Sequence, residues 1–436
     1  PIRLCSNMTF YMEAGAIIRF VTDFEAYPPV KTRWSGYEAY GYHPLLFGSG
    51  LKRVAIKGEG VIDGQGQAWW QAARKLRQGG DPGPYSRELK TLNRALIESV
   101  KSNILEWESQ FFRPPLLQLI HCTDVVLEGV TLQNSPFWNT HLVYCNRVNI
   151  RGVTFKNPSD TPNGDGLDID SCQNVRVSDC HFDVGDDCLC LKSGIDEDGR
   201  RVGIPTENVA ITNCTMLHGH GGVVMGSETA GGIRRVVISN CVFIGTDRGI
   251  RVKTNRARGG GVEDVQVSNI YMRDVLCPLA INAFYRWGVD ESDPNMNNPE
   301  AVPITEGTPV VRNLTISGIT ALNCTAAAAF VYGLPERPIE NISITHSRFE
   351  MTLDPNEQGG EPDMVQDKRI MAGDGMLFRH VRGLELHRVK IGTRQGPAIM
   401  LEQVEDAEID SVRAIHAHPG VEPISIKDSK HVHVTP

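Results

Sequence analysis

The sequence lacks several features that would point to common classes of protein. No run of about 18 apolar residues occurs, so no helix that spans a membrane is predicted. Basic residues are not in excess: 44 lysines and arginines against 52 acids give a formal charge of −8, which argues against a general nucleic-acid-binding protein. The start has no pattern typical of a secretory signal. The remaining composition, 41% apolar and 22% charged, is ordinary for a globular protein and excludes a disordered chain.

Helical periodicity is also missing from most of the chain, and a short repeating unit takes its place. The unit reads apolar-x-apolar, two small or polar residues, then apolar-x-apolar, as in 124–132 and 147–155. Alternation with a period of two predicts short strands with one buried face. Copies in the middle of the chain begin roughly 23 to 34 residues apart, which is typical of solenoid repeats. Further copies begin at Arg53, Asn174, Asn208, Arg235, Asp264, Asn313, Asn341, Gly383 and Asp406.

These repeats predict an all-β fold, a right-handed single-stranded parallel β-helix with loops and short helices inserted. Strands joined by polar corners cannot form βαβ units, but they can coil so that each turn stacks its apolar residues on the next. Because 436 residues exceed one ordinary core unless the core grows in one dimension, we expect a single domain over 1–436. Insertions are predicted at about 66–112, with short helices, and at 286–308. We also expect the first turns of the solenoid to precede residue 1, outside this sequence.

The 11 cysteines favour the same fold. Two sets of three occupy equivalent positions in successive units, namely Cys122, Cys145 and Cys172, and Cys180, Cys214 and Cys241. Equivalent positions stack in a β-helix, so both sets are predicted to be interior ladders of small apolar groups. A metal site is the alternative, but no CxxC pair and no histidine at ligand spacing supports it. We therefore predict no metal and no cofactor.

Acidic clusters interrupt the apolar pattern in the middle of the chain. Asp165 lies 21 positions before Asp186, close to one turn, so a coil places Asp165 beside Asp186 and Asp187. Three carboxylates in one cleft repel each other, so their pKa values must separate. Glycosidic bond hydrolysis needs this separation, because one carboxyl group protonates the leaving oxygen and an ionised one activates water. The competing interpretations are turn-capping aspartates and a calcium site.

A histidine and a basic strand follow these acids. His220 has glycines on both sides, which indicates that another group approaches the backbone closely there. Its imidazole could hydrogen-bond a carboxylate and change its pKa, although a lone histidine is more often structural. Arg251 and Lys253 are two residues apart, so they project from one strand face and favour an anionic ligand. A solvated basic edge is the alternative.

Together these clusters resemble the polygalacturonases of glycoside hydrolase family 28. The family's ordered motifs Asn-x-Asp-Gly, Gly-Asp-Asp, Gly-His-Gly and Arg-x-Lys match Asn163–Gly166, Gly185–Asp187, Gly219–Gly221 and Arg251–Lys253. The resemblance implies an inverting hydrolase of α-1,4-linked galacturonic acid chains. It implies that Asp186 is the general acid, that Asp165 and Asp187 position and activate water, and that His220 supports the acid. The substrate-binding residues that it implies are Asn163, Lys192, Arg251, Lys253 and Tyr285.

The sequence departs from the family in two places, and the first, a comparison with fungal endo-acting members, bears on the mode of action. The chain is longer between Asp187 and His220, where residues 192–201 fill the gap, and residues 226–228 and Arg248 are similar to bacterial exo-acting members. An exo-acting enzyme is therefore predicted, whose inserted loops close one end of the groove. The second departure is Gly164, where many relatives carry Thr or Asn; this position does no chemistry.

Three other functions stay open at this point. They are a hydrolase of rhamnogalacturonan or another decorated pectin, a calcium-dependent pectate lyase, and a non-catalytic polysaccharide-binding solenoid. For an inverting hydrolase we expect the carboxyl groups that flank the bond to lie roughly 6.5–9.5 Å apart. The expected partner is a galacturonan, with no nucleic acid and no membrane. Neither an oligomeric state nor a compartment follows from the sequence, since a bacterial cytoplasm, a periplasm and secretion all fit it.

Overall fold

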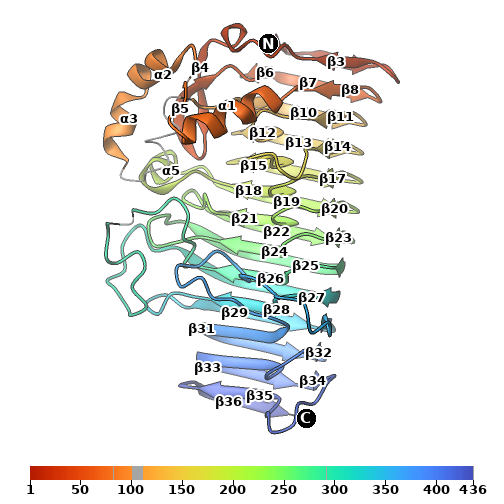
Figure 1. Cartoon of the computed structure of the whole chain (residues 1–436), viewed down its shortest axis with the longest axis vertical. Coiled ribbons are helices and arrows are strands. Elements are labelled where there is room, and N and C mark those ends of the chain that lie inside the picture. The colour runs from red at the N-terminus through yellow and green to blue at the C-terminus, as the bar shows by residue number, and fades with distance from the viewer. Residues whose placement is uncertain (82, 101–110, 291, 436) are drawn as a thin grey trace.

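The computed structural model describes residues 1–81, 83–100, 111–290 and 292–435. The chain winds into a right-handed parallel β-helix, as predicted, and its turns follow one another from the N-terminus to the C-terminus along the long axis (Figure 1). The strands pair in parallel in three stacks that run along this axis. No helix among the described residues has the length and apolarity needed to cross a membrane.

The first stack carries the strands that position the candidate site. Its strands pair in the order β1 (Ile2–Arg3), β6 (Leu46–Ser49), β9 (Leu117–Ile120), β12 (Thr140–Val143), β15 (Leu167–Asp170), β18 (Leu189–Lys192), β21 (Val223–Gly226), β24 (Arg248–Lys253), β26 (Cys277–Asn282), β28 (Ala327–Tyr332), β31 (Asp374–His387), β33 (Ile399–Asp410) and β35 (Ile424–Lys427).

The other two stacks complete each turn. The second consists of β2 (Met8–Met12), β7 (Lys52–Gly58), β10 (Thr123–Glu128), β13 (Asn146–Arg151), β16 (Gln173–Ser178), β19 (Thr206–Thr212), β22 (Ile233–Ser239), β25 (Gly261–Arg273), β27 (Val310–Cys324), β29 (Ile339–Thr345), β31, β33 and β36 (Lys430–Thr435). The third consists of β3 (Ile17–Arg19), β8 (Val61–Asp63), β11 (Thr131–Gln133), β14 (Thr154–Lys156), β17 (His181–Asp183), β20 (Thr215–Leu217), β23 (Val242–Ile244), parts of β25 and β27, β30 (Arg348–Met351), β32 (Lys390–Gly392) and β34 (Arg413–Ala414).

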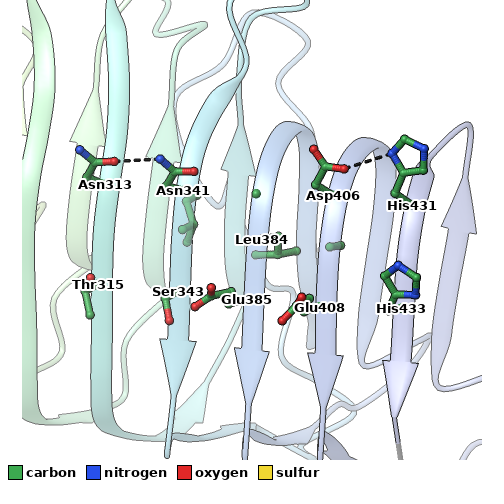
Figure 2. A pocket seen from close by; sticks show the side chains of 13 residues that line it. Asn313, Thr315, Asn341, Ser343, Leu384, Glu385, Asp406, Glu408, His431 and His433 are labelled. Atoms are coloured by element: carbon green, nitrogen blue, oxygen red, sulfur yellow. Dashed lines mark hydrogen bonds and ion pairs between the residues drawn. The ribbon is translucent and has the colours of Figure 1, made fainter.

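The polar residue near the start of each repeat has a backbone role. Asn313 and Asn341 have φ of 59° and 56°, in the left-handed region that Asn and Asp tolerate better than most residues. Their side chains also pair from turn to turn, since Asn341 Nδ2 donates to Asn313 Oδ1 at 3.0 Å. Asp406 and His431 continue this row at 3.1 Å (Figure 2). The repeated Asn or Asp therefore turns the chain at a corner.

Inward-facing residues of successive turns form one continuous core. Val148, Val175 and Val209 pair in register and are buried, and Phe155 stacks on Phe182 with ring centroids 4.8 Å apart. Burying each such side chain contributes about 1.5–3 kcal/mol. The predicted cysteine ladders lie in this core: ten of the 11 cysteines are buried and all are free thiols. Like charges or bulky groups at these positions would disrupt the stacking of neighbouring turns.

The insertions lie along one side of the β-helix, the helical one beside the N-terminal turns and the 286–308 loop beside the middle turns (Figure 1). The predicted short helices of 66–112 are α1 (Gln67–Arg77), α2 (Ser86–Leu92) and α3 (Arg94–Ser99), while residues 101–110 lie outside the described residues. The segment 286–308 is a long loop, apart from residue 291, which is also outside them. Three elements were not predicted: an antiparallel hairpin of β4 (Pro29–Trp34) and β5 (Tyr37–Tyr42), helix α5 (Asp196–Val202), and a long connection at 352–373. A 3-10 turn, η1 (Phe24–Ala26), precedes the hairpin.

Candidate active site

The coil brings the predicted acidic residues together. Asp165 and Asp187 each lie two residues before a strand, and these strands, β15 and β18, pair with Leu167 opposite Leu189. One oxygen from each of Asp165, Asp186 and Asp187 lies within 4.8 Å of the others. The proximity of the three side chains was correctly predicted. The separation of roughly 6.5–9.5 Å between the carboxyl groups that flank the bond stays a prediction, because the 4.8 Å limit concerns only the nearest oxygens.

These carboxylates line a pocket of about 150 Å³ on the outer face of the first stack. Its wall consists of Ser35, Trp138, Asn163, Asp165, Asp186, Asp187, Lys192, His220, Ser227, Glu228, Lys253, Tyr285, Trp287 and Met364. The wall includes five of the six other predicted site residues, and the sixth, Arg251, is not part of it. The volume is smaller than the roughly 300–1,000 Å³ typical of pockets for drug-sized ligands, so it suits one sugar unit rather than a long segment of chain.

The charge of Asp187 is stabilised by basic side chains of β24. Lys253 Nζ lies 2.6 Å from Asp187 Oδ2, and Arg251 Nη1 lies 3.6 Å from Asp187 Oδ1. Burial alone would raise the pKa of Asp187, but Lys253 and Arg251 hold that pKa well below its usual value. Gly221 makes room for this carboxylate, because a Cβ there would lie 3.0 Å from Asp187 Oδ1. The groups that approach the glycines around His220 are therefore parts of the chain itself, with Cys188 Sγ nearest to Gly219 and Val224 Cγ2 nearest to Gly221.

Asp165 is in the opposite electrostatic situation. It is almost fully buried, and burial together with the charges of Asp186, Asp168 and Asp187 raises its pKa well above the usual value. The carboxyl group of Asp168 lies behind it, and burial raises that pKa in the same direction. Asp165 therefore binds a proton at a pH at which Asp187 is ionised, so the pKa values in this cluster separate as the sequence predicted.

Lys192 is held in the pocket by an acid that the sequence analysis did not select. Its ammonium group lies 3.0 Å from Glu228 Oε2 and 3.6 Å from Asp168 Oδ1, and 4.5 Å from the centroid of the Trp138 ring. Asn163 is held from the side, because its Oδ1 accepts a hydrogen bond of 2.8 Å from Arg113. Lys192 and Asn163 thus both line the pocket in fixed positions, where each could contact a sugar.

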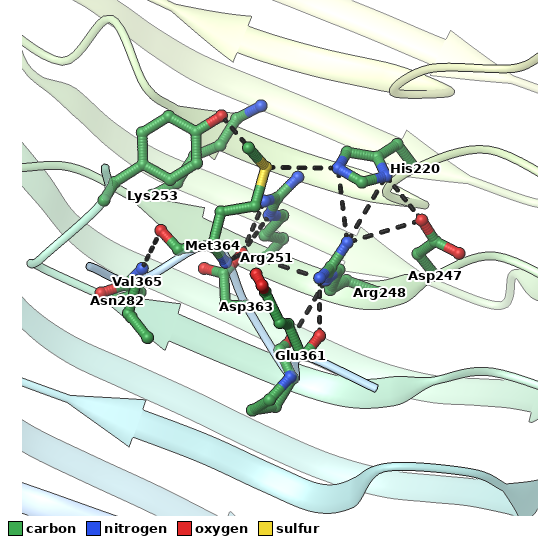
Figure 3. Close-up of polar contacts among 12 residues, drawn as sticks. His220, Asp247, Arg248, Arg251, Lys253, Asn282, Glu361, Asp363, Met364 and Val365 are labelled. Atoms are coloured by element: carbon green, nitrogen blue, oxygen red, sulfur yellow. Dashed lines mark hydrogen bonds and ion pairs between the residues drawn. The ribbon is translucent and has the colours of Figure 1, made fainter. Parts of the chain in front are cut away.

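His220 reaches the pocket, but its side chain does not hydrogen-bond the three aspartates. Its Nδ1 lies 2.5 Å from Asp247 Oδ2, and its Nε2 lies 3.5 Å from Met364 Sδ (Figure 3). Only the backbone joins it to the acidic cluster, through a hydrogen bond from His220 N to Asp186 O at 3.0 Å. Asp247 therefore fixes the orientation of the imidazole ring. His220 acts on Asp186 by positioning its backbone and not by a hydrogen bond to its carboxylate.

Arg251 departs from the prediction more strongly. Its side chain is fully buried and does not line the pocket. Both Nε and Nη2 donate to Asp363 Oδ1, at 3.0 and 2.5 Å (Figure 3). Tyr285 does line the pocket, with its ring centroid 5.5 Å from Lys253 Nζ. Of the two basic residues of the Arg-x-Lys motif, only Lys253 is thus accessible to a ligand in the pocket.

The inserted elements form the walls on both sides of the acidic cluster. Arg33 of the hairpin pairs with Asp170 at 3.0 Å in a fully buried contact, and Ile195 donates to Gly36 O, so the hairpin is fixed against β15 and the start of α5. A Cβ at Gly36 would lie 2.8 Å from Glu228 Cγ, so the hairpin tip needs glycine there. On the other side, Met364 of the 352–373 connection contacts His220 and Tyr285.

The acidic cluster could also offer oxygens to a cation, because its three aspartates present atoms within 4.8 Å of one another. Two observations oppose this use. Lys253 already lies 2.6 Å from Asp187, and the raised pKa of Asp165 favours its neutral form, which is a poor ligand. The donor set fits an acid–base site better than a calcium site.

Comparison with known proteins assigns the family. The family model described as "Glycosyl hydrolases family 28" matches residues 107–346, which is more than half of the chain. The chain belongs to glycoside hydrolase family 28. Among the relatives in this family, a probable polygalacturonase of Vitis vinifera is 32% identical over 350 residues, which cover 79% of this chain and 63% of that protein. The resemblance found in the four motifs is thus confirmed at the level of the family.

Solved structures of family 28 share the fold. An exopolygalacturonase of Thermotoga maritima matches with a TM-score of 0.67 and 31% identity, over 81% of this chain and 77% of that one. A family 28 exopolygalacturonase of Yersinia enterocolitica matches with a TM-score of 0.65 over 99% of this chain and 70% of that one, and at 21% identity its likeness concerns the fold alone. The chain spans about half to two thirds of the length of the plant polygalacturonases that it matches.

Several pocket residues were missed by sequence reasoning. They are Ser35, Trp138, Ser227, Glu228, Trp287 and Met364, and half of them, Ser35, Trp287 and Met364, belong to the inserted elements. No sequence pattern indicated that these residues would lie beside the four motifs. The segment 226–228 was noted for its likeness to exo-acting members, which is the one signal that could have indicated Glu228 as a pocket residue.

Proposed function

We propose that the protein is an exo-acting polygalacturonase that hydrolyses α-1,4-linked galacturonic acid by inversion. The observation that carries this proposal is the pocket itself, in which Asp165, Asp186 and Asp187 gather between the ammonium groups of Lys192 and Lys253. Acids with separated pKa values suit glycosidic bond hydrolysis, and cations beside them suit a uronic acid. Membership of family 28 and the polygalacturonase relatives support the same activity.

The three aspartates have different roles in this proposal. Asp186 is the general acid that protonates the leaving oxygen, since it is the least buried of the three and its carboxylate faces the pocket. Asp187 is the ionised base, because Lys253 stabilises its charge. Asp165 positions the water together with Asp187. Two acceptors within 4.8 Å can share one water molecule, because each hydrogen bond from water is about 2.7–2.8 Å long.

Inversion follows if that shared water attacks the anomeric carbon directly. A retaining enzyme instead uses one carboxylate as a nucleophile, with its two carboxyl groups about 5–5.5 Å apart. In favour of inversion, Asp187 is tied to Lys253 and Asp165 favours its neutral form, so neither is an available nucleophile. Proton NMR of the first product formed decides the point: the β-anomer is expected, and initial release of the α-anomer would contradict inversion.

The exo mode is supported by walls on both sides of a small pocket. Ser35 and Trp287 belong to inserted elements, as does Met364 opposite them, and the enclosed volume of about 150 Å³ suits one terminal unit. Chromatography of products from oligogalacturonides over time tests the mode. Monomer from the first minutes is the expected result, and a ladder of intermediates would identify an endo-acting enzyme.

A calcium-dependent lyase is the main competing activity, and it predicts a different product. A lyase removes a proton and leaves a double bond, so ultraviolet absorbance rises during cleavage and a chelator abolishes the reaction. We expect reducing ends to form without any rise in absorbance, in the presence of a chelator. A polysaccharide-binding protein without activity would form no reducing ends at all.

A further inference from the structure

A fully buried arginine joins several of the elements beside the pocket. Arg258 follows strand β24 on the chain, and its side chain has no exposed surface. Its Nε donates to Ser227 O at 3.0 Å, and its Nη2 donates to Trp287 O at 3.1 Å. Its Nη1 donates to Gly288 O at 3.2 Å and to Asp196 Oδ1 at 2.6 Å. One side chain thus binds the turn after β21, the long loop after β26 and helix α5.

The residues that Arg258 holds belong to the wall of the acidic pocket. Ser227 and Trp287 both line it, and so does Glu228, which pairs with Lys192 at 3.0 Å. Arg258 binds Ser227 and Trp287 through their backbone oxygens, so it fixes the course of the chain that carries these side chains. The position of this part of the wall therefore depends on a side chain that does not itself line the pocket.

Arginine suits this role better than lysine does. Its planar guanidinium group carries five N–H donors in a rigid fork, so it can bond several acceptors that lie in different directions. Lysine has the same charge, but its donors all lie on one atom at the end of a flexible stem. Carbonyl oxygens that lose a buried donor keep the full cost of desolvation. Replacing Arg258 by lysine should therefore release the turn and the loop while a positive charge remains beside Asp196.

A second buried arginine in the same segment provides an internal comparison. Arg256 lies two residues earlier, and its side chain is also almost fully buried. It binds both carboxylate oxygens of Glu336, at 2.7 and 2.9 Å, and donates to the backbone oxygens of Asn295 and Asn298, both at 2.6 Å. Within the described part of the chain, none of these partners lines the pocket. Arg256 thus anchors the same long loop, but at residues outside the wall.

The wall determines which parts of a polysaccharide can reach the acids. A pocket of about 150 Å³ with walls on both sides accepts the end of a chain, whereas a groove that is open at both ends also accepts its middle. We infer that Arg258 keeps the wall of Ser227 and Trp287 in place and thereby restricts cleavage to chain ends. Arg258 is then a specificity-determining residue that acts without touching the sugar. The inference rests on the proposed exo mode and names the residue that maintains it.

The test follows the first products from hexagalacturonate. An enzyme restricted to ends forms monomer and pentamer first, whereas cleavage of the central bond forms trimer. In Arg258→Lys, the initial ratio of trimer to monomer should rise about tenfold over the wild type, since small changes in a pocket alter discrimination by roughly 10–200-fold. Chromatography at low conversion measures this ratio, and thermal unfolding shows whether the variant is folded.

Arg256→Lys is the matched control. It removes the same fork from a buried arginine of the same segment, and the partners of that arginine lie outside the wall. We expect it to destabilise the protein as well, while the trimer to monomer ratio stays that of the wild type. An equal rise in both variants would show that any loosening of the loop opens the pocket, and it would refute the specific role of Arg258.

Asp196→Gly breaks the same connection from its other end, and it decides the question if Arg258→Lys does not fold. The side chain of Asp196 is 24% exposed and its φ is 46°, a backbone conformation that glycine adopts readily. The variant releases α5 from Arg258 and keeps the contacts to Ser227 and Trp287. The trimer to monomer ratio should rise less than in Arg258→Lys, by about threefold, because only one hydrogen bond is lost.

Three further results would overturn the inference, and they have different meanings. A ratio that is unchanged in folded Arg258→Lys, or in Asp196→Gly where the lysine variant does not fold, would refute the role of Arg258 and leave the exo mode intact. Trimer among the first products of the wild-type protein would refute the exo mode, and the inference with it. Absence of any cleavage by the wild type would refute the proposed activity itself.

Discussion

The middle and the C-terminal turns of the β-helix both carry pairs of opposite charge, but the pairs differ in their exposure to solvent. In the middle turns, Asp187 and Lys253 form a pair that is almost fully buried. In the C-terminal turns, Asp406 and His431 pair at 3.1 Å with side chains that are 59% and 69% exposed. Asp406 and His431 join the paired strands β33 and β36, whereas Asp187 precedes β18 and Lys253 lies on β24, with β21 between these two strands. Coverage by inserted elements, more than position along the stack of strands, therefore determines whether a charged group is buried and has a shifted pKa.

The physical reason is the loss of water around the covered groups. Near a surface, solvent screens a pair of charges, and such pairs contribute roughly 0–1 kcal/mol to stability. In a covered site the same charges interact strongly and change one another's pKa. The hairpin β4–β5, α5 and the 352–373 segment provide this cover in the middle turns.

Asp186→Asn should lower kcat by about 10²–10⁴-fold, which is the usual contribution of a general acid. The measurement is release of reducing ends from oligogalacturonides. Asp406→Asn, in the C-terminal turns, is the matched control and should leave kcat unchanged, because Asp406 lies outside the pocket. Near-normal turnover in Asp186→Asn would remove its assignment as the acid.

The same variant can be tested with an activated substrate. An aryl galacturonide with a good leaving group needs little protonation, so Asp186→Asn should keep much of its activity on that compound. Asp165→Asn should lose activity on both substrates, because it disturbs the water instead of the leaving group. The opposite pattern would assign the acid to Asp165, whose raised pKa also suits a proton donor.

Asp187→Asn should destabilise the protein strongly. It leaves the ammonium group of Lys253 buried without its 2.6 Å partner, and breaking a buried pair in this way costs about 3–5 kcal/mol. Denaturant unfolding at neutral pH measures the loss. His431→Ala provides the exposed counterpart and should lower the unfolding midpoint temperature by no more than about 2 °C. Equal losses in the two variants would contradict the role of coverage.

Asp165→Asn should have the reverse effect on stability at neutral pH. The folded pKa of Asp165 is raised above the unfolded value of about 3.9, so between the two pKa values only the folded state holds the proton. Its contribution to stability is therefore full below pH 4 and decreases as pH rises, by at most about 1.4 kcal/mol per pH unit. In thermal unfolding, the stability of Asp165→Asn relative to the wild type should therefore increase between pH 4 and pH 7.

The contribution of Asp187 has the opposite sign. Because its folded pKa is lowered, the stability that it provides is present above the unfolded pKa and is lost as pH falls below about 4. Lowering the pH below about 4 should therefore reduce the difference in unfolding free energy between the wild type and Asp187→Asn. A constant difference across this range would show that the pair with Lys253 does not set the charge of Asp187.

The smallest effect is expected for the row of corner residues. Asn341→Ala removes a hydrogen bond of 3.0 Å to Asn313 and a side chain suited to positive φ, and both losses are at an exposed position. Asn341→Asp keeps the backbone preference and serves as the control. The alanine variant should unfold a few degrees below the control, with unchanged activity in both.

The periodic part of the protein could be predicted from the sequence alone. Alternating apolar residues with Asn or Asp at the corners predict a β-helix. Turns of nearly constant length then bring Asp165 beside Asp187. The four motifs also sufficed to identify the family. The expectation of a single domain over the whole chain stays a prediction.

The cover over the site and the pairing of its charges became visible in the three-dimensional structure and not in the sequence. The partners Arg251 and Asp363 are separated by 112 residues, and Lys192 and Glu228 by 36. Such contacts depend on how irregular insertions return to the scaffold, and no periodic pattern encodes that path. Burial then sets the pKa values and access to solvent, because the energy of a charge depends on everything around it, whereas a strand depends mainly on its own alternation.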